Sequence, residues 1–217
     1  MVKQARAART RQALVRAAAE VFAAEGYAGA SLPAISERAG VSNGALHFHF
    51  ASKHDLAAEV ERAAAAGAQR LAERCRGRAD TLLQSLVHTA CGLLLAVVAD
   101  PVIRAGFRLS GDPSRKGGTR LLRWWQAWVH ELVVQAQREG ELARDVPADV
   151  ATTVIVAATA GFEVMGAADR DVLSAERVTQ LWTFVLPRLA SSPDHASTPP
   201  QPQTPLEQPG DQGGFRK

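Results

Sequence analysis

Apolar side chains recur at three- and four-residue spacing along the chain as far as about residue 190. The first such stripe predicts a helix over residues 3–25, which ends at Gly26 because glycine favours the position just past a helix. Further stripes, bounded by glycine, proline and capping residues, predict helices over 32–39, 43–50, 53–74, 81–99, 102–110, 119–139, 148–166 and 175–190. The sequence contains no strand-like alternation of any length, so the pattern predicts an all-α protein.

Residues 31–53 have the local signals of two short helices joined by a tight turn. Ser31 and Ser42 are good N-caps, and Ser52 followed by Asp55 has the spacing of a capping box. In a helix-turn-helix module, the second helix enters the major groove of DNA with its N-terminal residues nearest the bases. We therefore predict an N-terminal three-helix DNA-binding domain over residues 1–52.

The predicted reading helix begins with small polar residues. Ser42 and Gly44 would let its backbone approach DNA closely, and its free N–H groups and positive dipole end favour phosphate. Asn43 can donate to phosphate or read an adenine edge with both amide atoms. Leu46 and Phe50, four residues apart, are expected to face the core.

Charge around this stretch favours a polyanionic partner. The formal net charge is only +3, but the first 16 residues hold five cations and no acid. A lysine at the first position of a helix opposes the helix dipole, so an external anion is expected near Lys53. The predicted DNA contacts are Arg6, Arg9, Ser31, Ser42, Asn43, Gly44, His47, His49 and Lys53.

Two other interpretations of the histidines stay open at this point. The His47-Phe48-His49 spacing, with His54 nearby, is also used by metal sites, but no cysteine or acid pair completes a ligand set. The same histidines could be plain surface residues.

The sequence also lacks a glycine-rich phosphate loop and a convincing nucleophile–base pair. We therefore expect no metal site, no cofactor and no catalytic residues.

Residues from about Arg6 to Leu56 resemble the DNA-binding domain of TetR-family transcriptional regulators. The motifs are Phe22-x-x-x-Gly26-Tyr27, Ile35-x-x-x-Ala39-Gly40-Val41, Gly44-Ala45-Leu46-x-Phe48-His49-Phe50 and Ser52-Lys53-x-Asp55-Leu56. Residues 2–7 and the segment from Arg104 to Leu109 resemble the γ-butyrolactone receptor branch, which includes pseudo-receptors that control antibiotic production. The resemblance implies a repressor that binds a DNA operator as a homodimer and is released by a small-molecule effector. Members of the family usually have Lys at the position of Asn43 and Tyr at that of His47. The loss of the Lys–phosphate contact is expected to weaken DNA binding.

The second predicted domain, residues 53–190, is expected to bind the effector and to form the dimer. All four tryptophans lie in it, and Trp125 and Trp128 share a helix face with Leu121 and Leu132. Such a stripe can be core, but aromatic side chains between helices also line small-molecule sites. The resemblance places Trp125 at the family's pocket tryptophan. The predicted lining residues are Leu83, Val87, Phe107, Trp125, Trp128, Val156, Ala160 and Phe162.

The predicted pocket is less polar than the resemblance implies, because Phe162 and Ala64 stand where polar residues often occur in the branch. Either the effector is more apolar, or the protein is a pseudo-receptor or constitutive DNA-binding regulator without a butyrolactone response. A set of residues on the helix over 148–166 has spacing that would let two helices approach closely, and with residues 181–189 it is expected to form a two-fold dimer: Val154, Ala157, Ala158, Gly161 and Met165. The proline-rich segment 191–217 is expected to be disordered.

Cysteine content and hydropathy indicate the cellular compartment. Two cysteines give no disulfide framework, which fits a reducing cytoplasm, and no apolar run is expected to reach the length of a membrane span. Cys75 lies among Arg74, Arg76 and Arg78, which could lower its pKa and make it a redox sensor. A cytoplasmic protein without membrane contact is the expectation.

Overall fold

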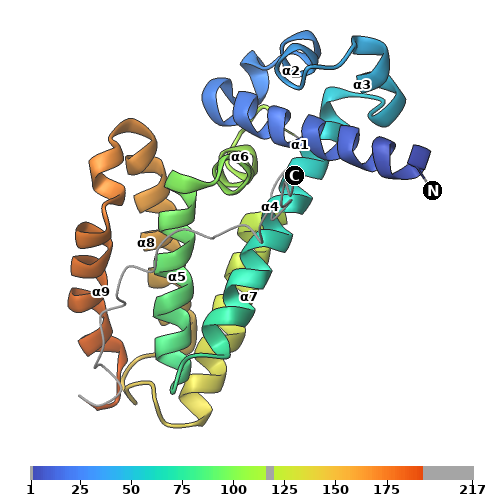
Figure 1. Cartoon of the computed structure of the whole chain (residues 1–217). Helices are drawn as coiled ribbons and strands as arrows, with labels where there is room; N and C mark the ends of the chain where they lie inside the picture. The colour runs from blue at the N-terminus through green and yellow to red at the C-terminus, as the bar shows by residue number, and fades with distance from the viewer. Residues whose placement is uncertain (1, 116–119, 193–217) are drawn as a thin grey trace, which may run out of the picture.

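The computed structural model describes residues 2–115 and 120–192, and within them the chain is helical (Figure 1). The helices are α1 Val2–Gly29, α2 Leu32–Arg38, α3 Asn43–His49, α4 Lys53–Arg76, α5 Leu82–Ala99, α6 Pro101–Ser110, α7 Arg120–Arg138, α8 Ala148–Ala168 and α9 Ala175–Leu189, with a 3₁₀ turn η1 over Arg170–Leu173. The all-α prediction is confirmed. Most of the expected segment 191–217 lies outside the described residues.

Local capping explains why the predicted bounds agree with the structure to within a few residues. The backbone N–H groups of Ala34, Ala45 and Asp55 donate to the side chains of Ser31, Ser42 and Ser52. These bonds satisfy donors that have no partner within the helix. Gly26 interrupts α1 with a positive φ of 74°, so the regular helix ends there as predicted and one further turn follows.

The helices bury two apolar clusters. The smaller one holds α1–α3 together, and it extends to Leu56 and Val60 of α4 and to Ala105 and Leu109 of α6. The larger one lies among α4 from Ala64 onward, the whole length of α5, Ile103 and Phe107 of α6, and α7–α9. In Figure 1, α1–α3 form a group at the upper right, and α4 runs from it into the rest of the molecule.

Helix α6 lies between the two groups and packs closely on α4. A Cβ atom added at Gly106 would lie 2.3 Å from the Cβ of Ala64, so this crossing of α4 and α6 requires glycine. The same short helix contacts α1. A shift of α6 would therefore displace both α4 and α1.

One expectation about hydropathy is wrong. Leu82–Ala99 and Ala148–Gly166 are each long and apolar enough to cross a membrane by length and composition, with mean hydropathies of 1.9 and 1.4. Polar residues such as Gln84 and His88 interrupt the first run but do not offset its apolar average. In the fold α5 is a core helix, 61% of it buried, whereas only 22% of the α8 window is buried.

Candidate DNA-binding surface and effector pocket

The N-terminal end of α3 is capped from inside the module and open on its outer side. The Ser42 hydroxyl accepts a hydrogen bond from the backbone N–H of Ala45 at 3.2 Å, and Leu46 is fully buried beneath the helix. Most of the predicted DNA contacts are exposed, namely Arg6, Arg9, Ser31, Ser42, Asn43, Gly44 and His47, while His49 and Lys53 are partly buried. The structure thus brings a capped, polar helix start to the surface.

Asn43 is held in place by α2. The hydroxyl of Ser36, which is almost buried, lies 2.9 Å from the carbonyl oxygen of Pro33 and 3.2 Å from Oδ1 of Asn43, so its single proton is shared between these two acceptors. Reading an adenine with both amide atoms needs this oxygen as an acceptor. The contact with Ser36 occupies only one of the two lone pairs of this oxygen, so both predicted roles of Asn43 are compatible with the structure.

The reason given for a DNA contact at Lys53 is wrong. Its ammonium donates to the carbonyl oxygens of Tyr27 and Ala30, both at 2.8 Å, and lies 4.6 Å from the centre of the Tyr27 ring. These internal partners compensate the charge at the start of α4, so no external anion is needed. Lys53 ties α4 to the end of α1.

A polar junction that the sequence did not reveal continues from Tyr27 to α6 and the segment after it. The Asp112 carboxylate accepts the backbone N–H of Tyr27 at 3.1 Å, and Arg108 donates to the carbonyl of Ala23 at 2.7 Å. The Arg115 guanidinium lies 5.2 Å from the Tyr27 ring centre, on which Lys53 also lies. The ends of α1, α4 and α6 are therefore joined by charge-assisted contacts. Their partners lie far apart in sequence, which is why local patterns gave no signal.

The predicted effector residues gather in the larger apolar cluster. Leu83, Val87, Phe107 and Trp125 are buried in it, and Trp128, Val156 and Phe162 pack against it half-buried, while Ala160 is half-buried on α8. The rings of Trp125 and Trp128 stack, with centroids 5.4 Å apart. Seven of the eight predicted residues therefore belong to or border one core.

Three buried polar side-chain atoms in or beside this core have no hydrogen-bond partner among the residues that the structure describes. They are the indole nitrogens of Trp125 and Trp182 and the hydroxyl of Ser85. A buried donor without a partner costs about 1–3 kcal/mol. The core is therefore apolar in its lining but carries unsatisfied donors that an acceptor-bearing molecule could engage.

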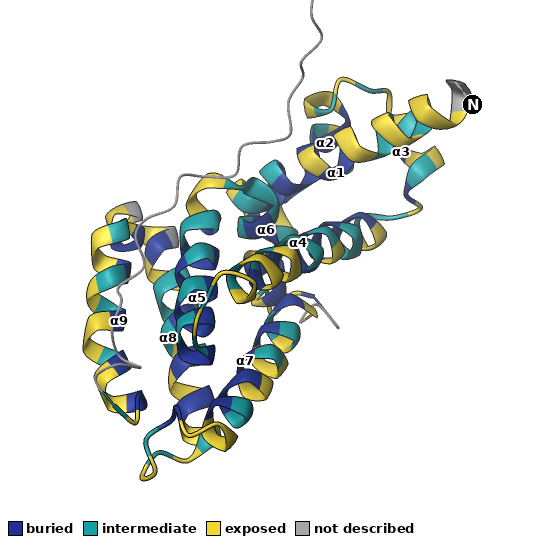
Figure 2. Cartoon of the chain, turned by 60° about the horizontal axis from the view of Figure 1, so that its bottom comes forward, coloured by how far each residue is buried: buried dark blue, intermediate teal, exposed yellow. Residues whose placement is uncertain are grey.

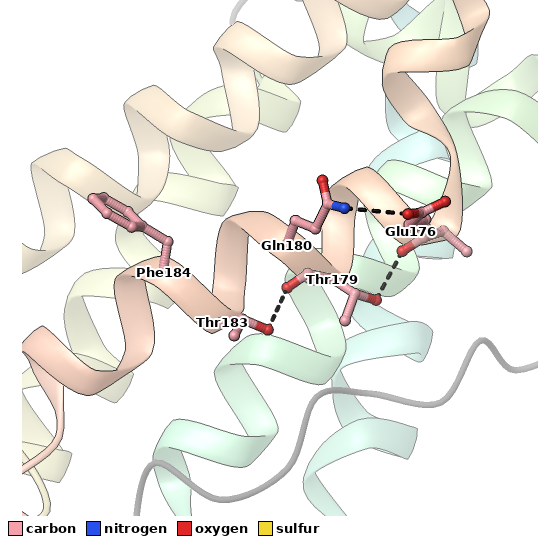
Figure 3. Close-up of a pocket in the computed structure, with 6 residues that line it drawn as sticks. Glu176, Thr179, Gln180, Thr183 and Phe184 are labelled. Carbon is pink, nitrogen blue, oxygen red and sulfur yellow. Dashed lines mark hydrogen bonds between the residues drawn. The ribbon is translucent and has the colours of Figure 1, made fainter.

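Two surface hollows lie away from these residues. One, of about 660 Å³, runs along α9 and is lined by Glu176, Thr179, Gln180, Thr183 and Phe184 (Figure 3). The hydroxyls of Thr179 and Thr183 bond back to their own helix, so they present methyl groups rather than free donors. The other, of about 390 Å³, lies between α7 and α8 beside His130. Both are shallow and open, unlike a site that encloses an effector.

Apolar side chains are exposed on α8 and α9. Val154, Val164 and Met165 of α8 are 43%, 66% and 53% exposed, and Phe184 of α9 is 82% exposed. Figure 2 shows the outer side of α9 as largely exposed. Val154 and Met165 belong to the residues expected at the dimer interface. An apolar surface of this kind is typical of protein–protein contact.

The cysteines do not have the character of a redox sensor. Burial raises the pKa of Cys75, and this effect outweighs the opposing influence of Arg74 and Arg78. Burial likewise raises the pKa of Cys91. The arginines act in the expected direction, but the expectation of a lowered pKa at Cys75 is wrong, because the thiol lies partly under the helix surface. Among the described residues, no three His, Cys, Asp or Glu side chains are grouped as metal ligands.

Comparison with known proteins gives the family. Residues 14–60 match the family of bacterial regulatory proteins named tetR. The chain is 32% identical over 191 residues to the A-factor receptor protein of Streptomyces griseus, covering 88% of this chain and 67% of that protein. The chain belongs to the TetR family. It is also 30% identical over 175 residues to the transcriptional repressor AcnR of Corynebacterium diphtheriae, covering 79% of this chain and 88% of the repressor.

Solved structures place this TetR-family protein beside the γ-butyrolactone receptors. A crystal structure of a γ-butyrolactone receptor, an ArpA-like protein, superposes with a TM-score of 0.76 at 28% identity, covering 88% of this chain and 93% of that one. CprB of Streptomyces coelicolor, in complex with its operator sequence, superposes with a TM-score of 0.74 at 29% identity over 88% and 93% of the two chains. The predicted resemblance to this branch is confirmed.

Proposed function

We propose that this TetR-family regulator is a ligand-responsive repressor. It binds a pseudo-palindromic operator as a homodimer and releases it when a small, largely apolar molecule enters the helical domain. The observation that carries the proposal is the exposed start of α3, capped by Ser42 and followed by Asn43 and Gly44, in a chain of this family. Backbone N–H groups and the positive end of a helix bind phosphate, and the following side chains face the groove.

The effector is proposed to be a γ-butyrolactone-like compound or an antibiotic intermediate. A hydrogen-bond acceptor on such a molecule would satisfy the unpartnered indole N–H of Trp125, while the surrounding apolar side chains would hold its hydrocarbon part. The relatives named as an A-factor receptor and as γ-butyrolactone receptors support this class. An effector can release DNA only by binding one conformation more tightly than the other.

The route from pocket to DNA is proposed to run through α4 and α6. Trp125 lies on α7, which contacts both helices. Helix α4 carries Lys53 at one end and, further along, Glu61, whose carboxylate lies 2.9 Å from the Arg115 guanidinium. Lys53 and Arg115 both lie on the Tyr27 ring of the polar junction. A shift of these helices would therefore move the end of α1 and, with it, the reading helix.

The exposed apolar residues of α8 and α9 are proposed to form the homodimer. A two-fold dimer would place two reading helices about 34 Å apart, one turn of DNA, facing two half-sites. The protein would act where the DNA is, in the cytoplasm of a bacterium. The alternative is a pseudo-receptor or constitutive regulator that binds DNA without a butyrolactone response, which the apolar Phe162 favours.

Selection of bound sequences from random DNA by the full-length protein tests the proposal. We expect enrichment of a pseudo-palindrome whose half-site centres are about ten base pairs apart. Synthetic γ-butyrolactones of different acyl length would then be titrated against the complex in a gel-shift assay. No enriched sequence would overturn the repressor assignment, and an enriched sequence released by none of the compounds would favour the constitutive alternative.

A further inference from the structure

Phe48 is a large apolar residue that the fold leaves at the surface. It is 82% exposed, although it lies in α3 between His47 and His49. Its ring meets the His49 imidazole edge-on, with centroids 5.2 Å apart at 84°, and it belongs to neither apolar cluster. Phe48 therefore adds little to the stability of the module, since a buried phenylalanine gains its stabilisation from area removed from water.

Phe48 lies one helical turn after Gly44, so both residues share a face of α3. A Cβ atom at Gly44 would meet only the Ser42 hydroxyl oxygen, at 3.9 Å. Packing within the chain therefore does not require glycine at this position. The absence of a side chain lets an external surface approach the backbone at Gly44, and the ring of Phe48 then reaches that surface one turn further on.

The polar side chains beside this face have contacts within the protein. The Ser42 hydroxyl accepts from the backbone N–H of Ala45, and Oδ1 of Asn43 lies 3.2 Å from the Ser36 hydroxyl. Phe48 is the one exposed apolar side chain within α3, all of which is described. It offers no hydrogen bond, so it can recognise only an apolar feature. In the major groove, that feature is the C5-methyl group of thymine.

We propose that Phe48 reads a thymine in each operator half-site by packing its ring against the C5-methyl group. The inference rests on the proposed DNA-binding function and adds a specificity determinant to it. The charge of the surroundings favours DNA over an apolar protein partner. Helix α3 has no acidic residue, and Arg6 and Arg9 are exposed on α1.

The test exchanges single methyl groups on the DNA. Each thymine of the selected operator is replaced by deoxyuridine, which lacks only the C5-methyl, and dissociation constants are measured for the wild type and for Phe48→Ala. For the wild type we expect a loss of roughly three- to fivefold for one methyl, and of roughly 10- to 25-fold when both half-sites are changed. Phe48→Ala should bind the thymine operator about as weakly as the wild type binds the uracil operator. It should not distinguish the two.

Phe48→Leu is the matched variant, because it keeps an apolar side chain and should retain part of the discrimination. Thermal unfolding of the variants should match the wild type, since the residue is exposed. Equal binding of the wild type to every thymine and uracil operator would overturn the inference, as would a Phe48→Ala variant that still discriminates. A failure of the wild type to select any DNA would instead overturn the proposed function, so the two failures are distinguishable.

Discussion

The Arg115 guanidinium and the Glu61 carboxylate form an ion pair of 2.9 Å whose side chains are 1% and 4% exposed. The Ser110 hydroxyl donates to the other carboxylate oxygen at 3.2 Å, and Arg115 also donates to the Leu109 carbonyl. The pair joins the middle of α4 to the segment after α6. A buried ion pair adds little net stability over an apolar pair, but it fixes one geometry and is costly to break from one side.

Removing one partner of this pair should destabilise the protein strongly. Glu61→Gln leaves the Arg115 charge buried without compensation, and we expect a loss of about 3–5 kcal/mol in the free energy of unfolding. Urea denaturation measures it. The double variant Glu61→Leu, Arg115→Met removes both charges and should recover most of the loss. A cost below about 1 kcal/mol for Glu61→Gln would contradict the buried pair.

Glu59 should make stability depend on pH in the acid range. Hydrogen bonds from Arg11, and then from Arg62, lower the pKa of its carboxyl to about 2 from the ordinary 4.5. A lowered pKa in the folded state stabilises the protein above the ordinary pKa, and this stabilisation is lost as the pH falls from about 5 toward 2. Because these side chains are partly open to solvent, we expect an effect of about 1 kcal/mol.

The measurement is the difference in unfolding free energy between the wild type and Glu59→Gln at pH 5, 4 and 3. The difference should shrink as the pH falls, because protonation of Glu59 removes the same contacts that the substitution removes. Other carboxyl groups titrate equally in both proteins and cancel. A difference that stays constant over this range would show that Glu59 does not ionise with a lowered pKa.

Gly44→Ala should separate stability from function. The added Cβ meets nothing closer than 3.9 Å, and alanine favours a helix over glycine by about 0.5–1 kcal/mol. The melting temperature should therefore stay the same or rise. On the proposed DNA surface the methyl group would hold the backbone away from the groove, so operator affinity should fall about tenfold or more in a gel-shift assay. Unchanged affinity would place the DNA elsewhere on the module.

The proposed role of Trp125 in effector binding can be tested without leaving a large cavity in the core. Trp125→Ala would remove a fully buried side chain and cost about 3–5 kcal/mol, so a loss of response would be ambiguous. Trp125→Phe keeps an aromatic ring but removes the indole N–H. We expect operator binding to persist, while the effector concentration for half-release rises about tenfold or more, as for a lost hydrogen bond.

The matched control is Trp182→Phe, which removes an equally buried and unpartnered indole N–H from α9. It should leave the release concentration close to that of the wild type. Equal effects of both substitutions would indicate a general loosening of the core. A normal effector response of Trp125→Phe would show that the indole N–H does not contact the effector.

The helices and the reading module could be predicted because their signals are local. Ser42 caps a donor three residues away, and Gly26 ends α1 by its own conformation. The polar junction could not be predicted, because its hydrogen bonds join distant parts of the sequence. Lys53 donates to carbonyls 23 and 26 residues earlier, and Asp112 accepts from the N–H of Tyr27, 85 residues away. The prediction of an external anion at Lys53 was wrong because the tertiary fold brings backbone carbonyl oxygens to its ammonium. The sequence alone does not show that these acceptors lie there.

The exposure of Phe48 was missed for a different reason. Leu46 and Phe50 were correctly assigned to the core by their spacing, and both are buried. The family motif contains the aromatic residue between them but does not indicate its exposure. Two inward positions four residues apart leave the residue midway between them on the other side of the helix. That geometry could have marked Phe48 as exposed from the sequence.

The shared apolar cluster limits how this regulator can be recombined with others. Ala105 and Leu109 of α6, both fully buried, complete the packing of α1–α3 although they lie more than fifty residues beyond the reading helix. A hybrid that joined residues 1–52 to a foreign sensor would replace these side chains and expose or overpack the underside of α1. Functional chimeras of this protein should therefore graft the matching face of α6 together with the DNA-reading module, so the transferable unit is discontinuous in sequence.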